Sequence, residues 1–238
     1  MPGHAAIAQP SGHKFRGKQP SLLSSPNDFE GPRESIEASE HWRRRGALMG
    51  APVIHETAVV DEGARLGEGT RVWHFTHVSS GSTLGAGCVL GQNVFIGPGV
   101  VIGDRVKIQN NVSVYSGVTI ADDVFLGPSC VFTNVLTPRA HVERKDEFAR
   151  TPVGKGVTVG ANATVVCGHS LGDFALVGAG SVVTKDVAAH AVVVGNPARR
   201  VGWACRCGEL LPDDGVCARC GDAYEVTPQS CRWVRSRG

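Results

Sequence analysis

Long apolar runs and a strong charge of one sign are both missing from this sequence of 238 residues. No apolar stretch approaches the roughly 18 residues that a membrane span requires. The first residues also lack the apolar core of a secretory signal peptide. The formal net charge is only +2, so the total charge gives no sign of a nucleic-acid-binding surface. We therefore expect a soluble, cytoplasmic protein with no membrane span and no nucleic-acid partner.

Aromatic residues are also scarce, at 6% of the chain, and charged residues make up only 19%. Glycine is abundant instead, with 31 residues. A composition with few bulky rings and many glycines fits a solenoid of thin coils with small corners. It directs attention to sequence repeats.

A repeat of six residues organises the stretch 53–136. Every sixth position there is a large apolar residue: Ile54, Val60, Leu66, Val72, Val78, Leu84, Leu90, Ile96, Ile102, Ile108, Val114, Ile120, Leu126 and Phe132. A small or β-branched residue follows four places later in most hexads, and glycine often follows the apolar residue directly. A period of six is neither helical nor a plain strand alternation. It predicts an all-β fold, a parallel β-helix in which each hexad supplies one short strand and one corner.

The aliphatic-Gly-x-x-x-x pattern resembles the hexapeptide acyltransferases. This resemblance implies a left-handed parallel β-helix with three hexads, or 18 residues, in each coil. Residues 18 apart in sequence then stack directly, about 4.8 Å apart. The apolar positions resume at Val159 after a gap, and GNPAR at 195–199 closes the solenoid.

Three further segments surround this repeat. Residues 1–48 are rich in proline and polar residues and predict a disordered tail, ahead of a β-helix domain over 49–202. The charged segment 137–152 interrupts the repeat and predicts a protruding, functional loop. Residues 203–238 contain five of the eight cysteines and form a separate small segment.

The cysteines fall into two groups. Cys88 and Cys130 occupy small inward positions of their hexads and are expected to be buried, inert thiols. The C-x-C and C-x₂-C pairs predict a structural zinc site, with the metal bound by Cys205, Cys207, Cys217 and Cys220. A disulfide pair and redox-active cysteines remain as alternatives, and Cys231 is expected to be free.

Several stretches narrow the resemblance. VWHFTHV at 72–78 and LGQNVFIG at 90–97 resemble the first coils of nucleotide-sugar N-acetyltransferases. KIQNNVSVY at 107–115, GPSCVFTNV at 127–135 and the charged loop resemble the enzymes that acetylate UDP-2-acetamido-3-amino-2,3-dideoxyglucuronate. GANATVVCG at 160–168, VTKDV at 183–187 and GNPAR are similar to the acetyl-CoA-binding coils of the wider superfamily. The resemblance covers roughly residues 53–203.

The 18-residue lattice then places a polar column at one corner of the prism. Asn93 stacks on Asn111, with Phe75 and Ser129 in the neighbouring coils, beside His74, Gln92 and Asn110. An asparagine ladder can be purely structural, because stacked amides satisfy one another. Asn93 is nevertheless the catalytic candidate, because its amide can orient an amine or stabilise an oxyanion. His77 and His74 are the candidate bases, ahead of His141 and His169.

The resemblance implies ligand contacts on either side of this corner. Substrate contacts fall on Asn111, Tyr115, Arg139, Arg144 and Lys145, with the loop cations suited to a diphosphate and a uronate carboxylate. Acetyl-CoA contacts fall on the backbone near Ala161 and Gly178, and on Lys185 with Arg199 or Arg200.

The resemblance implies an acetyl-CoA-dependent N-acetyltransferase in surface-polysaccharide (O-antigen type) precursor synthesis. UDP-2-acetamido-3-amino-2,3-dideoxyglucuronate is the expected substrate, and a homotrimer is the expected assembly. A dTDP-amino-sugar enzyme, another small-molecule O- or N-acetyltransferase and a non-catalytic assembly protein remain alternatives. A carbonic anhydrase on the same coil is disfavoured, because no third histidine follows His74 and His77 at a coil spacing.

Overall fold

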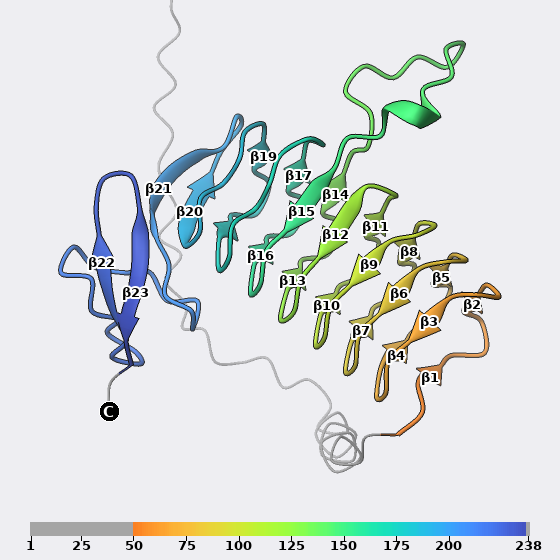
Figure 1. Cartoon of the computed structure of the whole chain (residues 1–238), viewed down its shortest axis with the longest axis horizontal. Coiled ribbons are helices and arrows are strands. Elements are labelled where there is room, and N and C mark those ends of the chain that lie inside the picture. The colour runs from red at the N-terminus through yellow and green to blue at the C-terminus, as the bar shows by residue number, and fades with distance from the viewer. Residues whose placement is uncertain (1–49, 237–238) are drawn as a thin grey trace, which may run out of the picture. The chain divides into compact units, whose positions relative to one another are not determined.

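The computed structural model describes residues 50–236. It forms a parallel β-solenoid whose coils are stacked side by side (Figure 1). The predicted tail over 1–48 lies outside the described residues. Within residues 50–236, no helix has the length and apolar character to cross a membrane.

Each hexad folds as predicted, into a strand of two residues followed by a corner. The strand pairs residue for residue with the strand 18 positions later, as Val53 does with Arg71. The second residue of each strand points inward, which is why the apolar period is six. From Val72 onward these positions are buried, whereas Ile54 at the open first coil is 45% exposed.

The strands form three sheets, which are parallel except at β21, and one hairpin. The nine-strand sheet contains β1 (Val53–Ile54), β4 (Arg71–Val72), β7 (Val89–Leu90), β10 (Lys107–Ile108), β13 (Phe125–Leu126), β16 (Thr158–Val159), β18 (Leu176–Val177), β20 (Ala191–Val194) and β21 (Arg199–Trp203). The seven-strand sheet contains β2 (Val59–Val60), β5 (His77–Val78), β8 (Phe95–Ile96), β11 (Ser113–Val114), β14 (Val131–Phe132), β17 (Thr164–Val165) and β19 (Val182–Val183). The five-strand sheet contains β3 (Arg65–Leu66), β6 (Thr83–Leu84), β9 (Val101–Ile102), β12 (Val118–Ile120) and β15 (Thr151–Val153). The hairpin pairs β22 (Ala223–Val226) with β23 (Cys231–Arg235).

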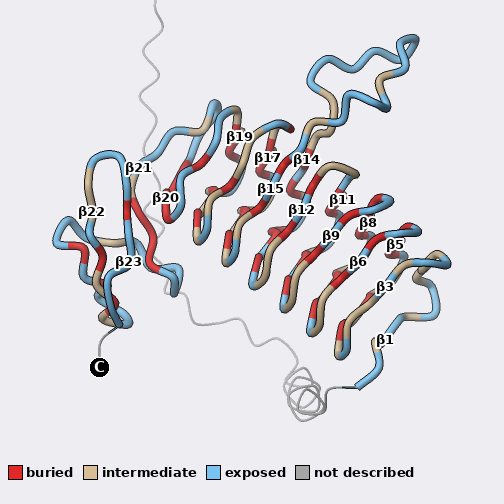
Figure 2. The backbone as a smooth tube through the Cα atoms, in the orientation of Figure 1, coloured by how far each residue is buried: buried red, intermediate tan, exposed pale blue. Residues whose placement is uncertain are grey.

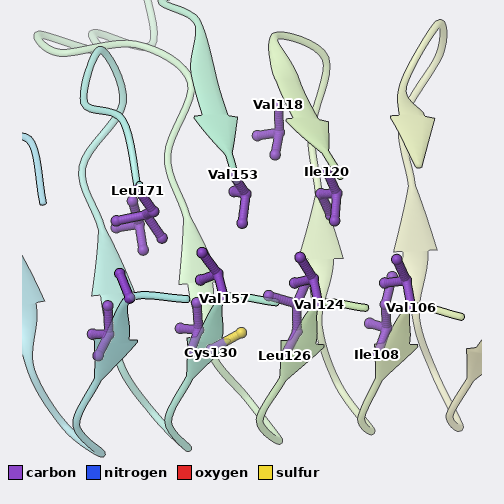
Figure 3. Packing of buried hydrophobic residues seen from close by; sticks show 14 of the residues in the cluster. Val106, Ile108, Val118, Ile120, Val124, Leu126, Cys130, Val153, Val157 and Leu171 are labelled. Atoms are coloured by element: carbon purple, nitrogen blue, oxygen red, sulfur yellow. The ribbon is translucent and has the colours of Figure 1, made fainter. Parts of the chain in front are cut away.

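The core is a continuous column of aliphatic side chains inside the prism. Figure 3 shows Ile120 and Val153 of the five-strand sheet facing Ile108 and Leu126 of the nine-strand sheet. Each fully buried side chain of this size contributes about 1.5–3 kcal/mol relative to its exposed state. Cys88 and Cys130 lie in this column, and burial raises the pKa of Cys130 to about 12, so both thiols are inert as expected.

The corners explain the glycines and several unusual backbone angles. Coils approach so closely that a Cβ on Gly85 would lie 2.6 Å from the carbonyl carbon of Gly103. Asn93 and Asn111 adopt positive φ angles of 57° and 61°, a left-handed conformation that asparagine tolerates better than most residues.

The interruption of the repeat is an insertion at one corner. β15 pairs with β12, placing Val153 opposite Ile120, so the next buried anchor after Phe132 is Val153 and not Val159. Those anchors are 21 positions apart, 15 more than one hexad. The predicted loop over 137–152 therefore ends earlier, because Thr151 already begins β15. The loop, with the short 3₁₀ helix η1 (Lys145–Glu147), projects away from the solenoid and is largely exposed (Figure 2).

The C-terminal residues cover the last coil. β21 runs antiparallel to β20 and brings the buried Trp203 against the end of the core. The cysteine-rich segment follows and ends in the β22–β23 hairpin.

Candidate active site and metal centre

The outward face of the seven-strand sheet carries a histidine–carboxylate pair. His77 is the outward residue of β5, and its Nε2 lies 3.1 Å from both carboxylate oxygens of Asp61. The two side chains are 43% and 38% exposed. A carboxylate only accepts hydrogen bonds, so it fixes the His77 proton on Nε2 and leaves Nδ1 with its lone pair. Among residues 50–236, Nδ1 has no hydrogen-bond partner, so it is free to accept a proton from a bound group.

Aromatic rings extend from this pair along the sheet. The Phe95 ring meets the edge of His77 at a centroid distance of 5.6 Å, and Tyr115 lies 6.0 Å beyond Phe95. Tyr115 is exposed at the corner below the insertion, where Gly117 receives the backbone N–H of Thr151. The predicted substrate residue Tyr115 and the candidate base His77 therefore belong to one continuous surface.

The predicted asparagine ladder forms the corner at the other edge of the same sheet. Asn93 Nδ2 donates to Asn111 Oδ1 at 3.0 Å, and both side chains are exposed. Asn110 has a different task. Its Oδ1 accepts the backbone N–H of Gln92 at 2.8 Å, just as Asp104 Oδ1 accepts that of Ala86 at another corner. Asn110 therefore shapes a turn, whereas one Asn93 donor and the face of the ladder remain open.

The second candidate base, His74, faces a different surface. Its ring stacks on His55 at 3.6 Å, and it lines a hollow of about 260 Å³ with Trp73, Gln92 and Asn110, on the side of the nine-strand sheet. The structure thus brings His77, and not His74, onto the face between the asparagine ladder and Tyr115. Sequence reasoning missed His55 and Asp61. The coil lattice held the signal for both, since they precede their partners by roughly one coil.

The cationic side chains of the loop form hydrogen bonds or ion pairs with other residues of the loop. Arg144 Nη1 donates to Glu147 at 2.8 and 2.9 Å, Lys145 Nζ lies 2.9 Å from Glu143, and Arg139 donates to the carbonyl of Pro138. Arg139, Arg144 and Lys145 line a hollow of about 480 Å³. Arg144 Nε is buried without a hydrogen-bond partner in the described structure.

The predicted cofactor residues lie nearer the C-terminal end of the solenoid. Ala161 and Gly178 occupy the corner that carries Asn93 and Asn111, in later coils. The lack of a side chain at Gly178 is explained by packing, since a Cβ there would lie 2.8 Å from Val194 Cγ1. Lys185, Arg199 and Arg200 line a separate hollow of about 470 Å³ at the end of the solenoid.

The four predicted metal ligands converge. The sulfur atoms of Cys205, Cys207, Cys217 and Cys220 all lie within 4.8 Å of one another. Two of these distances are 3.4 Å (Cys205–Cys220) and 3.6 Å (Cys207–Cys217). Tetrahedral zinc with bonds of about 2.3 Å separates its sulfur ligands by about 3.8 Å. All are free thiols, so the cluster has the donor set and size of a Cys₄ zinc site.

Comparison with known proteins identifies the repeat. Residues 63–98 and 99–134 match the bacterial transferase hexapeptide model, and residues 150–185 match the hexapeptide repeat of succinyl-transferase. Residues 63–134 therefore carry bacterial transferase hexapeptide repeats, and the coils after the loop carry a second kind of hexapeptide repeat. The predicted hexapeptide β-helix is therefore confirmed, with its repeat resuming after the loop as the strand register requires.

Acetyltransferases are among the relatives that the chain matches. It is 44% identical over 82 residues to dTDP-3-amino-3,6-dideoxy-alpha-D-galactopyranose 3-N-acetyltransferase from Aneurinibacillus thermoaerophilus, covering 34% of this chain and 43% of that protein. It is 34% identical over 83 residues to galactoside O-acetyltransferase from Escherichia coli, covering 34% and 41%. The matched stretch thus spans less than half of either relative.

Among solved structures, PerB from Caulobacter crescentus in complex with CoA and GDP-perosamine aligns at 22% identity and a TM-score of 0.43, covering 70% of this chain and 64% of that one. WeeI from Acinetobacter baumannii aligns at 23% identity and a TM-score of 0.46, covering 71% and 66%.

Proposed function

We propose that this protein transfers the acetyl group of acetyl-CoA to the amino group of a nucleotide-linked amino sugar. The observation that carries the proposal is the 44% identity of its coils to a dTDP-amino-sugar 3-N-acetyltransferase. A face bearing His77–Asp61, flanked by an asparagine ladder and an insertion rich in cations, supports it.

In this reaction the protein has to orient the two substrates and accept one proton. The neutral amine nitrogen attacks the thioester carbonyl, forming a C–N bond and a tetrahedral oxyanion. The C–S bond then breaks, CoA leaves as a thiolate and the amine nitrogen must lose a proton. His77 Nδ1 accepts that proton, and the carboxylate of Asp61 stabilises the resulting imidazolium.

Asn93 supplies a neutral donor in this scheme. Its amide has two N–H groups, and one is used by Asn111 at 3.0 Å. The second is available for the developing oxyanion, or the amide oxygen accepts from the amine and orients it. Either role is exerted only when the reacting atoms are in place, so it acts mainly on kcat.

The cofactor runs along the asparagine corner. The coils of Gly178, Ala161, Asn111 and Asn93 lie along this edge in that order, at about 4.8 Å per coil, and the β13–β14 coil separates those of Ala161 and Asn111. Backbone amides in the coils of Gly178 and Ala161 hold the extended pantetheine arm. The arm then places its thioester near Asn93. The phosphates of acetyl-CoA are attracted by Lys185, Arg199 and Arg200 at the C-terminal end of the solenoid.

UDP-2-acetamido-3-amino-2,3-dideoxyglucuronate is the proposed substrate, for surface-polysaccharide synthesis. Its carboxylate and diphosphate are suited to Arg139, Arg144 and Lys145 of the loop. A dTDP-linked 3-amino sugar is the second candidate, favoured by the A. thermoaerophilus relative. Either sugar presents the same kind of amine to His77, so the loop decides between them.

A structural zinc and a homotrimer complete the proposal. A Cys₄ site holds its metal without an open position, so zinc stabilises the C-terminal segment and takes no part in acetyl transfer. A prism with shallow surfaces gains a closed site when a second subunit packs beside the outward face.

A single assay tests the reaction. The purified protein is incubated with acetyl-CoA and a panel of UDP-, dTDP- and GDP-linked amino sugars, and thiol release and product mass are followed. The expected result is thiol release with one sugar class, and a product heavier by one acetyl group. The absence of acetyl transfer to every amino sugar, with acetyl-CoA bound, would reject the proposed function.

A further inference from the structure

The hollow at the end of the solenoid has walls from two parts of the chain. The last coil and the strand β21 that covers it supply Lys185, Asp186, Arg199 and Arg200, and the turn between β22 and β23 supplies Pro228 and Gln229. Three cations face one carboxylate there, so the hollow favours an anion. Its volume of about 470 Å³ accommodates part of a nucleotide.

Arg200 ties the hairpin turn to the solenoid. Its guanidinium donates to the carbonyl of Pro228 and lies 4.2 Å over the centre of the Trp203 ring. One donor of the five is used in this tie, so Arg200 joins the two walls and still has N–H groups for a ligand. The turn is itself closed by hydrogen bonds between Thr227 and Ser230.

The position of the hairpin depends on the cysteine cluster. β22 begins three residues after Cys220, and Cys217 N–H donates to the carbonyl of Asp222 at 2.9 Å. Tyr224 of β22 donates from its hydroxyl to Cys205 Sγ at 3.3 Å and accepts from Arg206 N–H. So few residues bury little apolar area, and a metal is the usual substitute for a core in a segment of this size.

The base of the hairpin is docked on the last coil by aromatic contacts. The His190 ring stacks on Phe174 at 5.3 Å and meets the Tyr224 ring edge-on at 5.2 Å, while its Nδ1 lies 2.9 Å from the Ala204 carbonyl oxygen. These contacts fix one end of the segment. The far end, at Pro228 and Gln229, is held by Arg200 and by the cysteine cluster through β22.

We propose that the C-terminal segment is a metal-dependent wall of an anion pocket. Zinc at the four cysteines holds the β22–β23 turn against Arg200, and the completed pocket binds the phosphorylated nucleotide end of acetyl-CoA. This inference rests on the proposed function, since it takes acetyl-CoA as the ligand. It adds that zinc, though remote from acetyl transfer, sets the affinity for the cofactor.

Binding of adenosine 3′,5′-diphosphate and of CoA tests the inference without any amino sugar. The dissociation constants are measured by calorimetry for the zinc-loaded full chain, for the same protein after chelation, and after zinc is restored. We expect chelation to raise both Kd values by about tenfold or more, on the scale of losing one charge-assisted hydrogen bond, and zinc to restore them. Far-UV circular dichroism of each sample checks that the solenoid stays folded.

Point variants of the pocket keep the test decisive if chelation unfolds the protein. In the zinc-loaded state, Arg200→Gln and Gln229→Ala are each expected to raise the Kd of both adenosine 3′,5′-diphosphate and CoA. Lys107→Ala, which removes an exposed cation on β10, is expected to leave the Kd unchanged. Equal Kd values with and without zinc, or in the variants, would overturn the inference and leave the acetyltransferase proposal intact. A zinc-loaded chain that binds no CoA would overturn both.

Discussion

At the residue scale, the chemistry depends on which histidine has a carboxylate partner. Asp61 lies at a corner of the first coil and reaches His77 of β5 in the next, over 16 residues of sequence. Among residues 50–236, the side chain of His74 contacts only other rings, on the opposite side of its corner. A base that gains a proton is stabilised by a nearby carboxylate, so the geometry favours His77.

His77→Asn is expected to lower kcat/KM by about 10²-fold or more, the usual contribution of a positioned general base. Asp61→Asn should give a smaller loss, since the imidazole remains but lacks its stabilising charge. His74→Asn is the matched control. If His74→Asn abolishes activity while His77→Asn does not, our choice of base is wrong.

Asn93→Gly is expected to lower kcat/KM by about 10²-fold, on the scale of losing one oxyanion donor. The loss should fall on kcat, with KM little changed. Glycine is the informative substitution because Asn93 has a φ of 57°, where alanine costs about 1 kcal/mol of stability through its Cβ. Asn93→Ala should therefore lose thermal stability as well as activity. Full activity of Asn93→Gly would leave the ladder with a structural role only.

The predicted stacking of Asn93 on Asn111 is confirmed, because the coil lattice is strict at this corner. Asn93 and Asn111 are 18 apart at equivalent corner positions, and their amides pair as the arithmetic requires. Asp61 and His55 were missed because their contacts run between a corner and a strand, or diagonally across a corner. The tie from Arg200 to Pro228 was also beyond prediction, since it needs the position of a segment outside the repeat.

At the element scale, the insertion and the cysteine-rich segment are the two parts that leave the six-residue period. The insertion emerges between β14 and β15, at the corner opposite the asparagine ladder across the seven-strand sheet. Its cations are spaced along a short, exposed segment that makes most of its ionic contacts within itself. Such a segment can exchange these weak contacts for those of a charged ligand.

Arg139→Ala is expected to raise KM for the nucleotide sugar by about tenfold, with kcat nearly unchanged, because a remote phosphate contact binds ground and transition states alike. Arg139 is the best loop cation to change, since it makes no ion pair in the described structure. Lys107→Ala on β10 is the control. Steady-state kinetics with the preferred sugar at saturating acetyl-CoA provides the measurement. An unchanged KM would remove the loop from substrate binding.

Metal retention in the cysteine-rich segment should depend on pH near neutrality. Burial opposes ionisation of Cys217, but backbone N–H donors from Cys220 and Arg219 outweigh it and lower the pKa of Cys217 to about 7. Zinc binds the thiolate, so a proton competes with the metal as pH falls through that value. We expect about one zinc per chain at pH 8 by metal analysis, and faster loss to a chelator at pH 6.

A Cys217→Ala/Cys220→Ala variant gives the matching control for that measurement. It should contain no zinc at either pH, and it should retain its kcat, since the metal is distant from His77. Cys231→Ala should keep its zinc, because burial raises the pKa of Cys231 to about 11 and this thiol lies outside the cluster. A zinc-free wild-type protein with an ordered hairpin would exclude the metal site.

The elements themselves were largely predictable, because a buried position every six residues constrains both strand and corner. The error lay at the insertion, where Val159 was taken as the next anchor. β15 spans Thr151–Val153 with Pro152 at its centre, and only the pairing with β12 identifies it as a strand. The lattice reappears once the 15 inserted residues are removed.

At the scale of the whole molecule, the described solenoid has a buried interior and an outward surface with exposed valines. Val59 is 55% exposed, Val101 is 52% exposed and Val131 is 46% exposed, and they lie on the seven- and five-strand sheets. These two sheets meet at the corner from which the loop projects. Apolar side chains grouped on neighbouring outward faces indicate a surface that packs against another protein.

We expect that partner to be a second and third copy of this chain, so that the active protein is a homotrimer. A cyclic arrangement places the outward face of one subunit beside the corner of the next, which closes the shallow surface around His77 into a cleft for both ligands. Multi-angle light scattering should give the mass of three chains of 25.0 kDa each. Val131→Glu, which puts a charge on the outward face of β14, should shift that mass toward the monomer and lower kcat/KM in parallel, while Val131→Ala should do neither. A wild-type protein that sediments as a monomer under assay conditions and still turns over would show that one subunit holds a complete site.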